Sequence, residues 1–229
     1  MRAPRHPTVL IDLDHTLLDS ATSEARAFDH TMAVAGVADP DRHREVYGEI
    51  NGRMWAAVER GEMAPGDVRL ARFREFVATT KIDADPQMMA DEYAGGLQRF
   101  GELFPGAHEA LDRISVASSL ALITNGVSDI QRARIDRLRI GSYFAAIVIS
   151  SEVGVAKPGA GIFDLAFEQL GGPPRDGAVM VGDSLTSDIR GAIDYGLATC
   201  WFNPSGASTE VDVTYEIASL DQLPPVVLG

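Results

Sequence analysis

Cysteine is almost absent from this chain of 229 residues, in which Cys200 stands alone. One cysteine excludes an intramolecular disulfide framework, and it also excludes a cysteine-rich zinc site. The five histidines are scattered along the chain and show no spacing typical of metal ligands. The composition therefore fits a protein of a reducing compartment.

Basic residues and long apolar runs are also scarce. Lysine and arginine number 20 against 33 aspartates and glutamates, which gives a net charge of −13. A chain this acidic lacks the basic patch that binds a nucleic-acid polymer or an anionic membrane surface. The first apolar run, residues 8–11, is too short for a signal peptide, and no run approaches the ~18 residues of a membrane span. We therefore expect a cytoplasmic protein, monomeric or homodimeric, that binds neither nucleic acid nor a membrane.

The chain instead contains a series of short and almost continuously apolar runs, at residues 8–11, 120–123, 146–149, 178–181 and 198–202. Such runs are typical of strands that are buried on both faces of a parallel sheet. Segments with helical spacing follow the second, third and fourth runs, at residues 130–138, 162–170 and 189–195. This alternation predicts an α/β fold with helices on both faces of the sheet.

Residues 17–101 interrupt the alternation, because they contain almost no β-type run and are rich in Ala, Met, Glu and Arg. Helical spacing within them predicts an all-helical insertion large enough for a small domain. The segment Phe104-Pro105-Gly106 then returns the chain to the sheet, and a helix is expected from about Ala107. We predict a core made of residues 1–16 and 102–229, with a helical domain at residues 17–101 inserted into it.

Two aspartates, Asp12 and Asp14, follow directly after the first predicted strand. Residues i and i+2 of an extended segment point the same way, so both carboxylates are aimed into the space beyond the sheet. Two like charges this close need a cation or a shared proton, and Mg²⁺ with its oxygen ligands is the simplest solution. A solvated loop with an aspartate helix cap is the common alternative for this short pattern.

The other strand ends carry polar residues as well. Asp183 follows the fourth strand, and Asp188 follows five residues later. Thr124 and Asn125 follow the second strand, where a hydroxyl, an amide and turn N–H groups suit a phosphate. Lys157 precedes a proline at the start of a predicted helix. Each signal alone is weak, because helix caps, turns and solvated lysines are common.

Taken in order, these motifs resemble those of the haloacid dehalogenase-like hydrolases over nearly the whole chain. The resemblance implies a Rossmann-like parallel sheet and makes residues 17–101 a cap domain. Further stretches resemble the pyrimidine 5′-nucleotidase branch of that superfamily: residues 123–127, 148–158 and 196–201, and in the cap Asn51, Trp55, Gly61, Arg72 and Phe73.

The resemblance also implies a role for each motif residue. Asp12 matches the nucleophile and Asp14 the general acid and base. Thr124 matches the hydroxyl that binds the phosphoryl group, with Asn125 beside it, and Lys157 matches the lysine that neutralises charge there.

The metal site that the resemblance implies holds Mg²⁺. Asp12, Asp183 and the backbone carbonyl of Asp14 match its ligands, and Asp188 matches a position that supports it directly or through water. His15 departs from the glycine that many members have at this place. His15 either narrows the entrance to the site, contacts the leaving group, or has no functional role, and we favour the last of these.

The implied activity is that of a phosphomonoesterase that forms an aspartyl-phosphate, with a nucleoside 5′-monophosphate as the leading substrate and Asp14 protonated at the start. Alternatives within the superfamily are a phosphatase for phosphoglycolate or a sugar phosphate, a phosphoryl-transferring mutase, a haloacid dehalogenase and a silent binding protein. Dehalogenases of the superfamily lack the acid at the place of Asp14, which disfavours that reading.

Specificity is expected from the cap. Trp55 is the best candidate for a substrate contact, and Phe28, Phe73 and Phe76 are further candidates for stacking on a base. Asn51 or Arg69 can hydrogen-bond to a base. Aromatic residues at helical spacing are more often part of a helical core, and we favour that reading for each of them.

Overall fold

The computed structural model describes residues 3–229, and its centre is a six-stranded parallel sheet with the order β3-β2-β1-β4-β5-β6. The strands are β1 (Thr8–Ile11), β2 (Ser119–Thr124), β3 (Ala146–Ile149), β4 (Ala178–Gly182), β5 (Ala198–Phe202) and β6 (Tyr215–Ile217). The five predicted strands are confirmed. The sixth, β6, was not predicted, because it has three residues in a weakly patterned tail.

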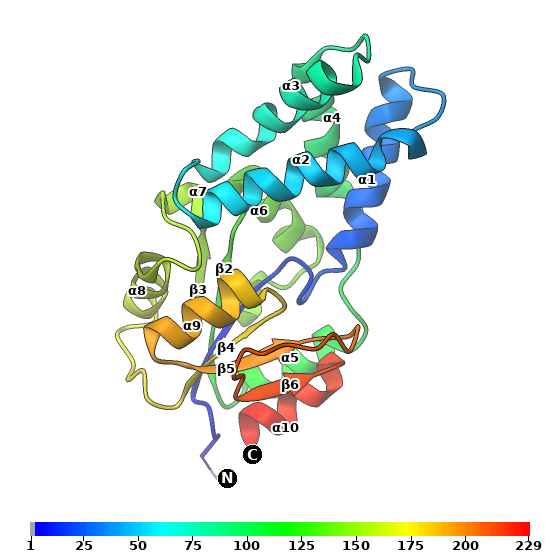
Figure 1. The fold of residues 1–229 in the computed structure, drawn as a ribbon. Coiled ribbons are helices and arrows are strands. Elements are labelled where there is room, and N and C mark those ends of the chain that lie inside the picture. Colours follow the sequence, from blue (N-terminus) through cyan, green and yellow to red (C-terminus); the bar gives the residue numbers. More distant parts are fainter. Residues whose placement is uncertain (1–2) are drawn as a thin grey trace.

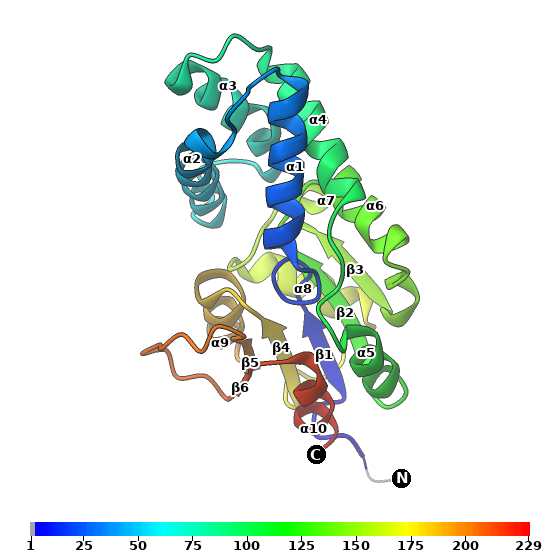
Figure 2. The ribbon, with the colours of Figure 1, turned by 90° about the vertical axis from the view of Figure 1, so that its right-hand side faces the viewer.

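Helices cover both faces of the sheet, as predicted (Figures 1 and 2). Those of the core are α5 (Ala107–Ser115), α6 (Ser128–Arg137), α7 (Ser150–Val153), α8 (Ala160–Gln169), α9 (Arg190–Tyr195) and α10 (Leu223–Leu228). Short helical turns lie between them: η2 (Gly141–Tyr143), η3 (Leu185–Ile189) and η4 (Leu220–Gln222). The helices α5 and α10 pack on one face, and α8 and α9 pack on the other.

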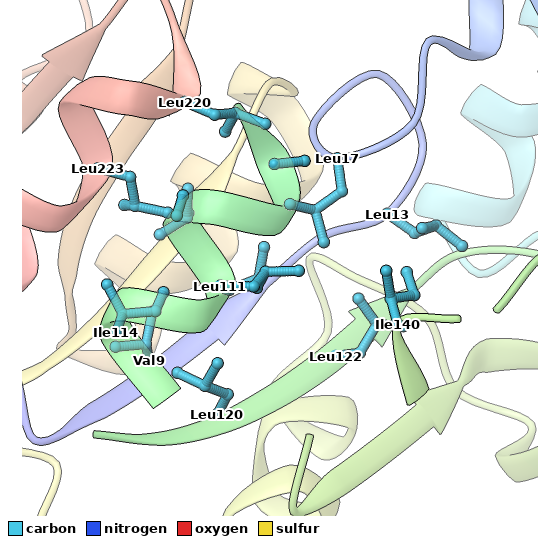
Figure 3. Close-up of a cluster of buried hydrophobic side chains, with 14 of the residues drawn as sticks. Val9, Leu13, Leu17, Leu111, Ile114, Leu120, Leu122, Ile140, Leu220 and Leu223 are labelled. Carbon is cyan, nitrogen blue, oxygen red and sulfur yellow. The ribbon is translucent and has the colours of Figure 1, made fainter. Parts of the chain in front are cut away.

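Strand β1 lies at the centre of the sheet, and its side chains alternate between the two faces. Val9 and Ile11 belong to the apolar cluster under α5 and α10, whereas Leu10 belongs to the cluster under α8 and α9. All three are completely buried, as the period of two along a strand requires for a sheet covered on both sides. Figure 3 shows the first cluster, in which Leu111 and Ile114 of α5 pack against this strand.

Four helices, which follow β1 and precede α5 along the chain, lie above the carboxyl edge of the sheet (Figures 1 and 2). They are α1 (Ser20–Val34), α2 (Asp41–Glu59), α3 (Val68–Thr80) and α4 (Pro86–Arg99), with the turn η1 (Pro65–Asp67) before α3. Asp19 caps α1, and Asp85 caps α4 ahead of Pro86 at the first helical position. These helices bury an apolar cluster of their own, so the predicted inserted helical cap is confirmed.

The chain enters and leaves the cap through two segments that lie side by side. Leu18 and Leu103 form an antiparallel bridge. The N–H of Asp19 donates to the carbonyl of Glu102 at 2.9 Å, and the N–H of Phe104 donates to the carbonyl of Leu17 at 2.8 Å. The domain boundaries that we predict at residues 16/17 and 101/102 stay predictions.

Across residues 3–229, no helix combines the length and the apolar character needed to cross a membrane.

Candidate functional site

A cavity of about 330 Å³ lies between the carboxyl edge of the sheet and the cap. Its floor is formed by loops after the strands and contains Asp12, Asp14, Asn125, Lys157, Asp183 and Asp188. The cap contributes Asn51, Trp55 and Glu59 from α2, Arg72 from α3, and Tyr93 and Leu97 from α4. Parallel α/β sheets bind ligands at this edge, where the strand order reverses about β1. The fold thus brings the predicted motif residues to one place.

Lys157 occupies the centre of the floor. Its ammonium donates to Asp12 Oδ1 at 2.5 Å and to the carbonyl of Ile123 at 2.8 Å. It also lies 2.7 Å from Asp188 Oδ1. Burial by itself lowers the pKa of Lys157, but the carboxylates of Asp12 and Asp188 raise it above its usual value. Lys157 is therefore a permanent positive charge held against Asp12.

Asn125 positions that lysine. Its Nδ2 donates to the carbonyl of Lys157, and its Oδ1 accepts from the N–H of Lys157, both at 2.9 Å. The amide thus ties the loop after β2 to the loop before α8. Asn125 also reaches the cavity wall.

Thr124 lies deeper than expected. Its side chain is completely buried, is not part of the cavity wall, and accepts a hydrogen bond from Gln131 Nε2 at 2.7 Å. Since the hydroxyl acts as the acceptor there, its own hydrogen is free to be donated.

Asp183 and Asp188 are placed by the chain after β4. Asp188 lies on the π-helical turn η3, and its Oδ2 accepts from the N–H of Ser184 at 3.1 Å. A Cβ on Gly182 would lie 2.2 Å from that oxygen, so only glycine admits this approach. Thr16 accepts from the N–H of Asp183 at 3.0 Å and donates to its carboxylate at 3.3 Å.

The carboxylates of Asp12, Asp183 and Asp188 each place an oxygen within 4.8 Å of the others. Burial raises the pKa of Asp183 to about 6, with Asp188 adding to the effect. Burial also raises the pKa of Asp12, and although Lys157 opposes this, Asp188 and Asp183 reinforce it. Asp188 Oδ1 is buried, and its partner among the described residues is the ammonium of Lys157 at 2.7 Å. Oxygen ligands carrying excess negative charge are the donor set of a hard divalent cation, so these residues fit a metal ion.

Asp14 lies beside this cluster, but its carboxylate is bound elsewhere. Oδ1 accepts from Ser20 Oγ at 2.6 Å and from Arg134 Nη1 at 2.7 Å, and Oδ2 accepts from Gln131 Nε2 at 2.7 Å. Burial raises the pKa of Asp14, but Arg134, Ser20 and Gln131 together lower it below its ordinary value. The expectation that Asp14 is protonated at the start is thus not met in this arrangement, because Arg134 holds it ionised.

Arg134 connects Asp14 with the cap. Its Nε donates to the carbonyl of Leu97 in α4 at 2.9 Å, and its Nη2 donates to Ser23 Oγ in α1 at 3.2 Å. One helical turn further along α6, Arg137 donates to the carbonyls of Gln98, Phe100 and Gly101. The two guanidinium groups therefore bind carbonyl groups at the C-terminal end of α4.

His15 also spans the core and the cap. Its Nε2 lies 3.7 Å from Glu24 Oε1 on α1, and both residues line the cavity. The nearby carboxylate of Glu24 raises the pKa of His15 to about 9 although burial opposes it, so the imidazole is protonated at neutral pH. His15 has a φ of 59°, in the left-handed region where glycine is favoured.

The structure separates the predicted cap residues. Trp55 and Asn51 line the cavity. Phe28, Phe73 and Phe76 lie in the apolar cluster of the cap and do not line the cavity, which agrees with the favoured reading of these three as core residues and not with stacking on the substrate. Arg69 is wrong as a base contact as well, because it lies outside the cavity and forms ion pairs on the surface.

Gln131 and Arg134 are two residues of the floor that the sequence reasoning missed. They lie three residues apart on α6 and are 1% and 3% exposed. The available signal was their position on the face of a helix that also carries Ile130 and Ile135, where polar residues need buried partners. The partner that they share, Asp14, is about 120 residues away in the sequence and could not be inferred from it.

The sheet, the inserted cap and the acidic strand ends define a class. The chain belongs to the haloacid dehalogenase-like hydrolases, whose family model matches residues 6–196, and it is therefore an enzyme of the hydrolase class.

Particular relatives are similar over almost the full length. The pyrimidine 5′-nucleotidase YjjG of Escherichia coli is 33% identical over 94% of this chain and 95% of its own. The pyrimidine 5′-nucleotidase PynA of Streptococcus pneumoniae is 31% identical over 94% and 92%. Among solved structures, the magnesium-bound HAD-hydrolase YfnB of Bacillus subtilis, described as revealing interdomain movement, superposes with a TM-score of 0.90. It is 30% identical and covers 97% of this chain and 98% of its own.

Proposed function

We propose that this hydrolase is a Mg²⁺-dependent phosphomonoesterase that acts on nucleoside 5′-monophosphates. The observation that carries the proposal is the buried pair of Asp12 and Lys157 beside the carboxylates of Asp183 and Asp188, at the bottom of a cavity closed by the cap. An anionic nucleophile can approach a phosphate dianion only if positive charge offsets the repulsion. Lys157 supplies part of that charge, and a metal ion held by the carboxylates and by the Asp14 carbonyl would supply the rest.

The proposed chemistry proceeds in two steps at Asp12. A carboxylate oxygen of Asp12 attacks phosphorus, the ester P–O bond breaks, and an aspartyl-phosphate forms. Water then attacks the phosphorus of this intermediate, and inorganic phosphate and the free carboxylate are regenerated. Lys157 holds the phosphoryl oxygens during both steps. The hydroxyl of Thr124 can join it only if this buried side chain, which lies outside the cavity wall, becomes accessible to the substrate.

Asp14 is proposed to protonate the leaving alkoxide and afterwards to take a proton from the attacking water. The ionised carboxylate bound to Arg134 suits the second of these roles. The first role needs the proton on Asp14, which requires that the contact with Arg134 is broken during the cycle. Since Arg134 also binds the carbonyl of Leu97, a movement of α4 would change the partners of Asp14.

The nucleotide preference rests on the relatives and on the cap. Two relatives that align along almost the whole chain are named pyrimidine 5′-nucleotidases. Trp55 in the cavity wall offers an indole face on which a base can stack. A cavity of about 330 Å³ lies at the lower end of the range for small-molecule sites.

A screen of phosphate release tests the proposal. The panel contains UMP, dUMP, dTMP, ribose 5-phosphate, sugar phosphates and phosphoglycolate, each with Mg²⁺ and with EDTA, and Asp12→Asn is the matched inactive control. We expect metal-dependent release with the highest kcat/KM for a nucleotide. A preference for phosphoglycolate or a sugar phosphate would overturn the nucleotide assignment. Chloride release from a 2-haloacid, or full activity of Asp12→Asn, would overturn the phosphatase assignment.

A further inference from the structure

The cap holds a buried arginine that no carboxylate accompanies. Arg72 is 4% exposed, and no acidic group in residues 3–229 forms an ion pair with it, although fifteen such pairs occur there. Its Nη1 donates to Asn51 Oδ1 at 3.0 Å, and its Nε is buried with no partner among the described residues. A buried charge left with free donors is costly unless a ligand completes it.

The surroundings hold this guanidinium at the cavity. Arg72 and Asn51 both line the cavity, on α3 and α2 respectively. The guanidinium carbon lies 4.5 Å from the ring centroid of Tyr93 and 5.5 Å from that of Phe73, so the charge packs against aromatic rings. The arrangement is a preorganised set of donors in the cap wall, opposite the floor that contains Asp12 and Lys157.

We propose that Arg72, oriented by Asn51, is a specificity-determining residue that donates hydrogen bonds to a carbonyl oxygen of the substrate's base. The inference rests on the proposed nucleotidase activity and adds which group of the base the enzyme recognises. Arginine donates and never accepts, so the group that it binds must offer lone pairs. Every pyrimidine base has a carbonyl oxygen at C2, whereas the bare sugar phosphate and adenine have no carbonyl.

A neutral carbonyl fits this wall better than a second anionic group of the substrate. Glu24 and Glu59 line the same cavity. Burial raises the pKa of Glu59, the hydroxyl of Thr186 opposes this, and the carboxylate of Asp188 adds to the rise, so Glu59 lies close to a second carboxylate. A distal carboxylate or phosphate would meet this charge, whereas a carbonyl would not.

The test compares two substrates that differ only by the base. The ratio of kcat/KM for UMP to that for ribose 5-phosphate is measured for the wild type, Arg72→Met and Arg72→Lys. Arg74→Met is the matched control, because Arg74 lies on the same helix and is exposed. We expect the ratio to fall about 50-fold in Arg72→Met, as the loss of a charge-assisted hydrogen bond predicts. We expect a smaller fall in Arg72→Lys, which keeps the charge without the fork, and no change in Arg74→Met.

Thermal unfolding of the same variants separates a binding role from a structural one. Because Arg72 is buried without a counter-ion, its replacement by methionine is expected to leave Tm unchanged or to raise it. A lower Tm together with an unchanged substrate ratio would overturn the proposal.

The outcomes also separate this inference from the proposed function. If the wild type hydrolyses ribose 5-phosphate better than UMP, the nucleotide assignment fails. If the wild type prefers UMP but the ratio is unchanged in Arg72→Met, only the role of Arg72 fails. The kcat/KM for ribose 1,5-bisphosphate is compared with that for ribose 5-phosphate in the same way. If Arg72→Met lowers this ratio but leaves the ratio for UMP unchanged, Arg72 binds an anion, and the carbonyl assignment is overturned.

Discussion

The ion pair between Asp14 and Arg134 allows a quantitative prediction. The Arg134 side chain is 4% exposed and that of Asp14 is 24% exposed. Breaking a buried pair by removing one partner costs about 3–5 kcal/mol, and the partial exposure of Asp14 favours about 3 kcal/mol for Arg134→Met. In the double variant Asp14→Asn/Arg134→Met no carboxylate is left uncompensated. We therefore expect a coupling energy of about 2 kcal/mol between the two substitutions.

Urea denaturation of the wild type, both single variants and the double variant at pH 7.5 measures this coupling. A coupling energy below about 0.5 kcal/mol, which is the range of exposed surface pairs, would refute the reasoning. It would mean that Arg134 acts through its bonds to Leu97 and Ser23 alone.

The pH dependence of the same pair gives an independent check. The folded protein lowers the pKa of Asp14 below 3.8, although burial opposes this, because Arg134 and Ser20 stabilise the carboxylate. The unfolded chain therefore binds the proton more tightly, and the contribution of the pair is fully present above pH 3.8. It is lost as the pH falls through the folded pKa. The stability difference between wild type and Arg134→Met should accordingly shrink towards pH 3, and a constant difference would contradict the ion-pair origin.

Three further predictions concern the nucleophile, the metal site and a buried histidine. Asp12→Asn is expected to abolish release of nitrophenol from p-nitrophenyl phosphate while the circular dichroism stays native, and residual full turnover would contradict the assignment. Mg²⁺ at about 100 times its dissociation constant should stabilise the wild type by about 2.7 kcal/mol. Asp183→Asn should lose most of that gain in Tm, and an equal gain in both would place the ion elsewhere. Burial lowers the pKa of His6 although a hydrogen bond to the carbonyl of Gly177 opposes this, so stability should decrease as the pH falls below 6.5. Urea denaturation at pH 7.5 and 5.5 should show a smaller decrease for His6→Gln, and an equal decrease would contradict this.

The sheet and the motif residues could be predicted because their signals are local. A strand buried on both faces needs an almost continuous apolar run, and β1 to β5 each have one. Strand β6 has only Ile217 fully buried, and its pairing depends on β5 rather than on its own pattern. The same limit applies to the site. Asp12 and Asp183 follow strands directly, whereas two partners of Asp14, Gln131 and Arg134, come from α6, about 120 residues away, and only the tertiary fold brings them together.

The aromatic residues of the cap show a second limit. Trp55, Phe73 and Phe76 all have helical spacing, and the pattern cannot state which of them faces the substrate. The packing of α1 against α4 and of α2 against α3 decides it, because it encloses Phe73 and Phe76 and leaves Trp55 at the cavity. For the same reason Arg72 was recognised only as part of a resemblance, and its lack of a counter-ion became visible in three dimensions.

The paired segments at the base of the cap affect which insertions and deletions the chain can tolerate during evolution. Because Leu18 and Leu103 are neighbours, the ends of the insertion are already closed, and lengthening or shortening the helices between them adds only a small loop-closure entropy. Such changes leave the register of β1 against β2 and β4 unaffected. The helices of the insertion can therefore be rebuilt in length and sequence while the sheet that carries Asp12 and Asp183 keeps its geometry. A variant in which a hairpin turn joins Leu18 directly to Leu103 would lack the cap helices and should still form the parallel sheet.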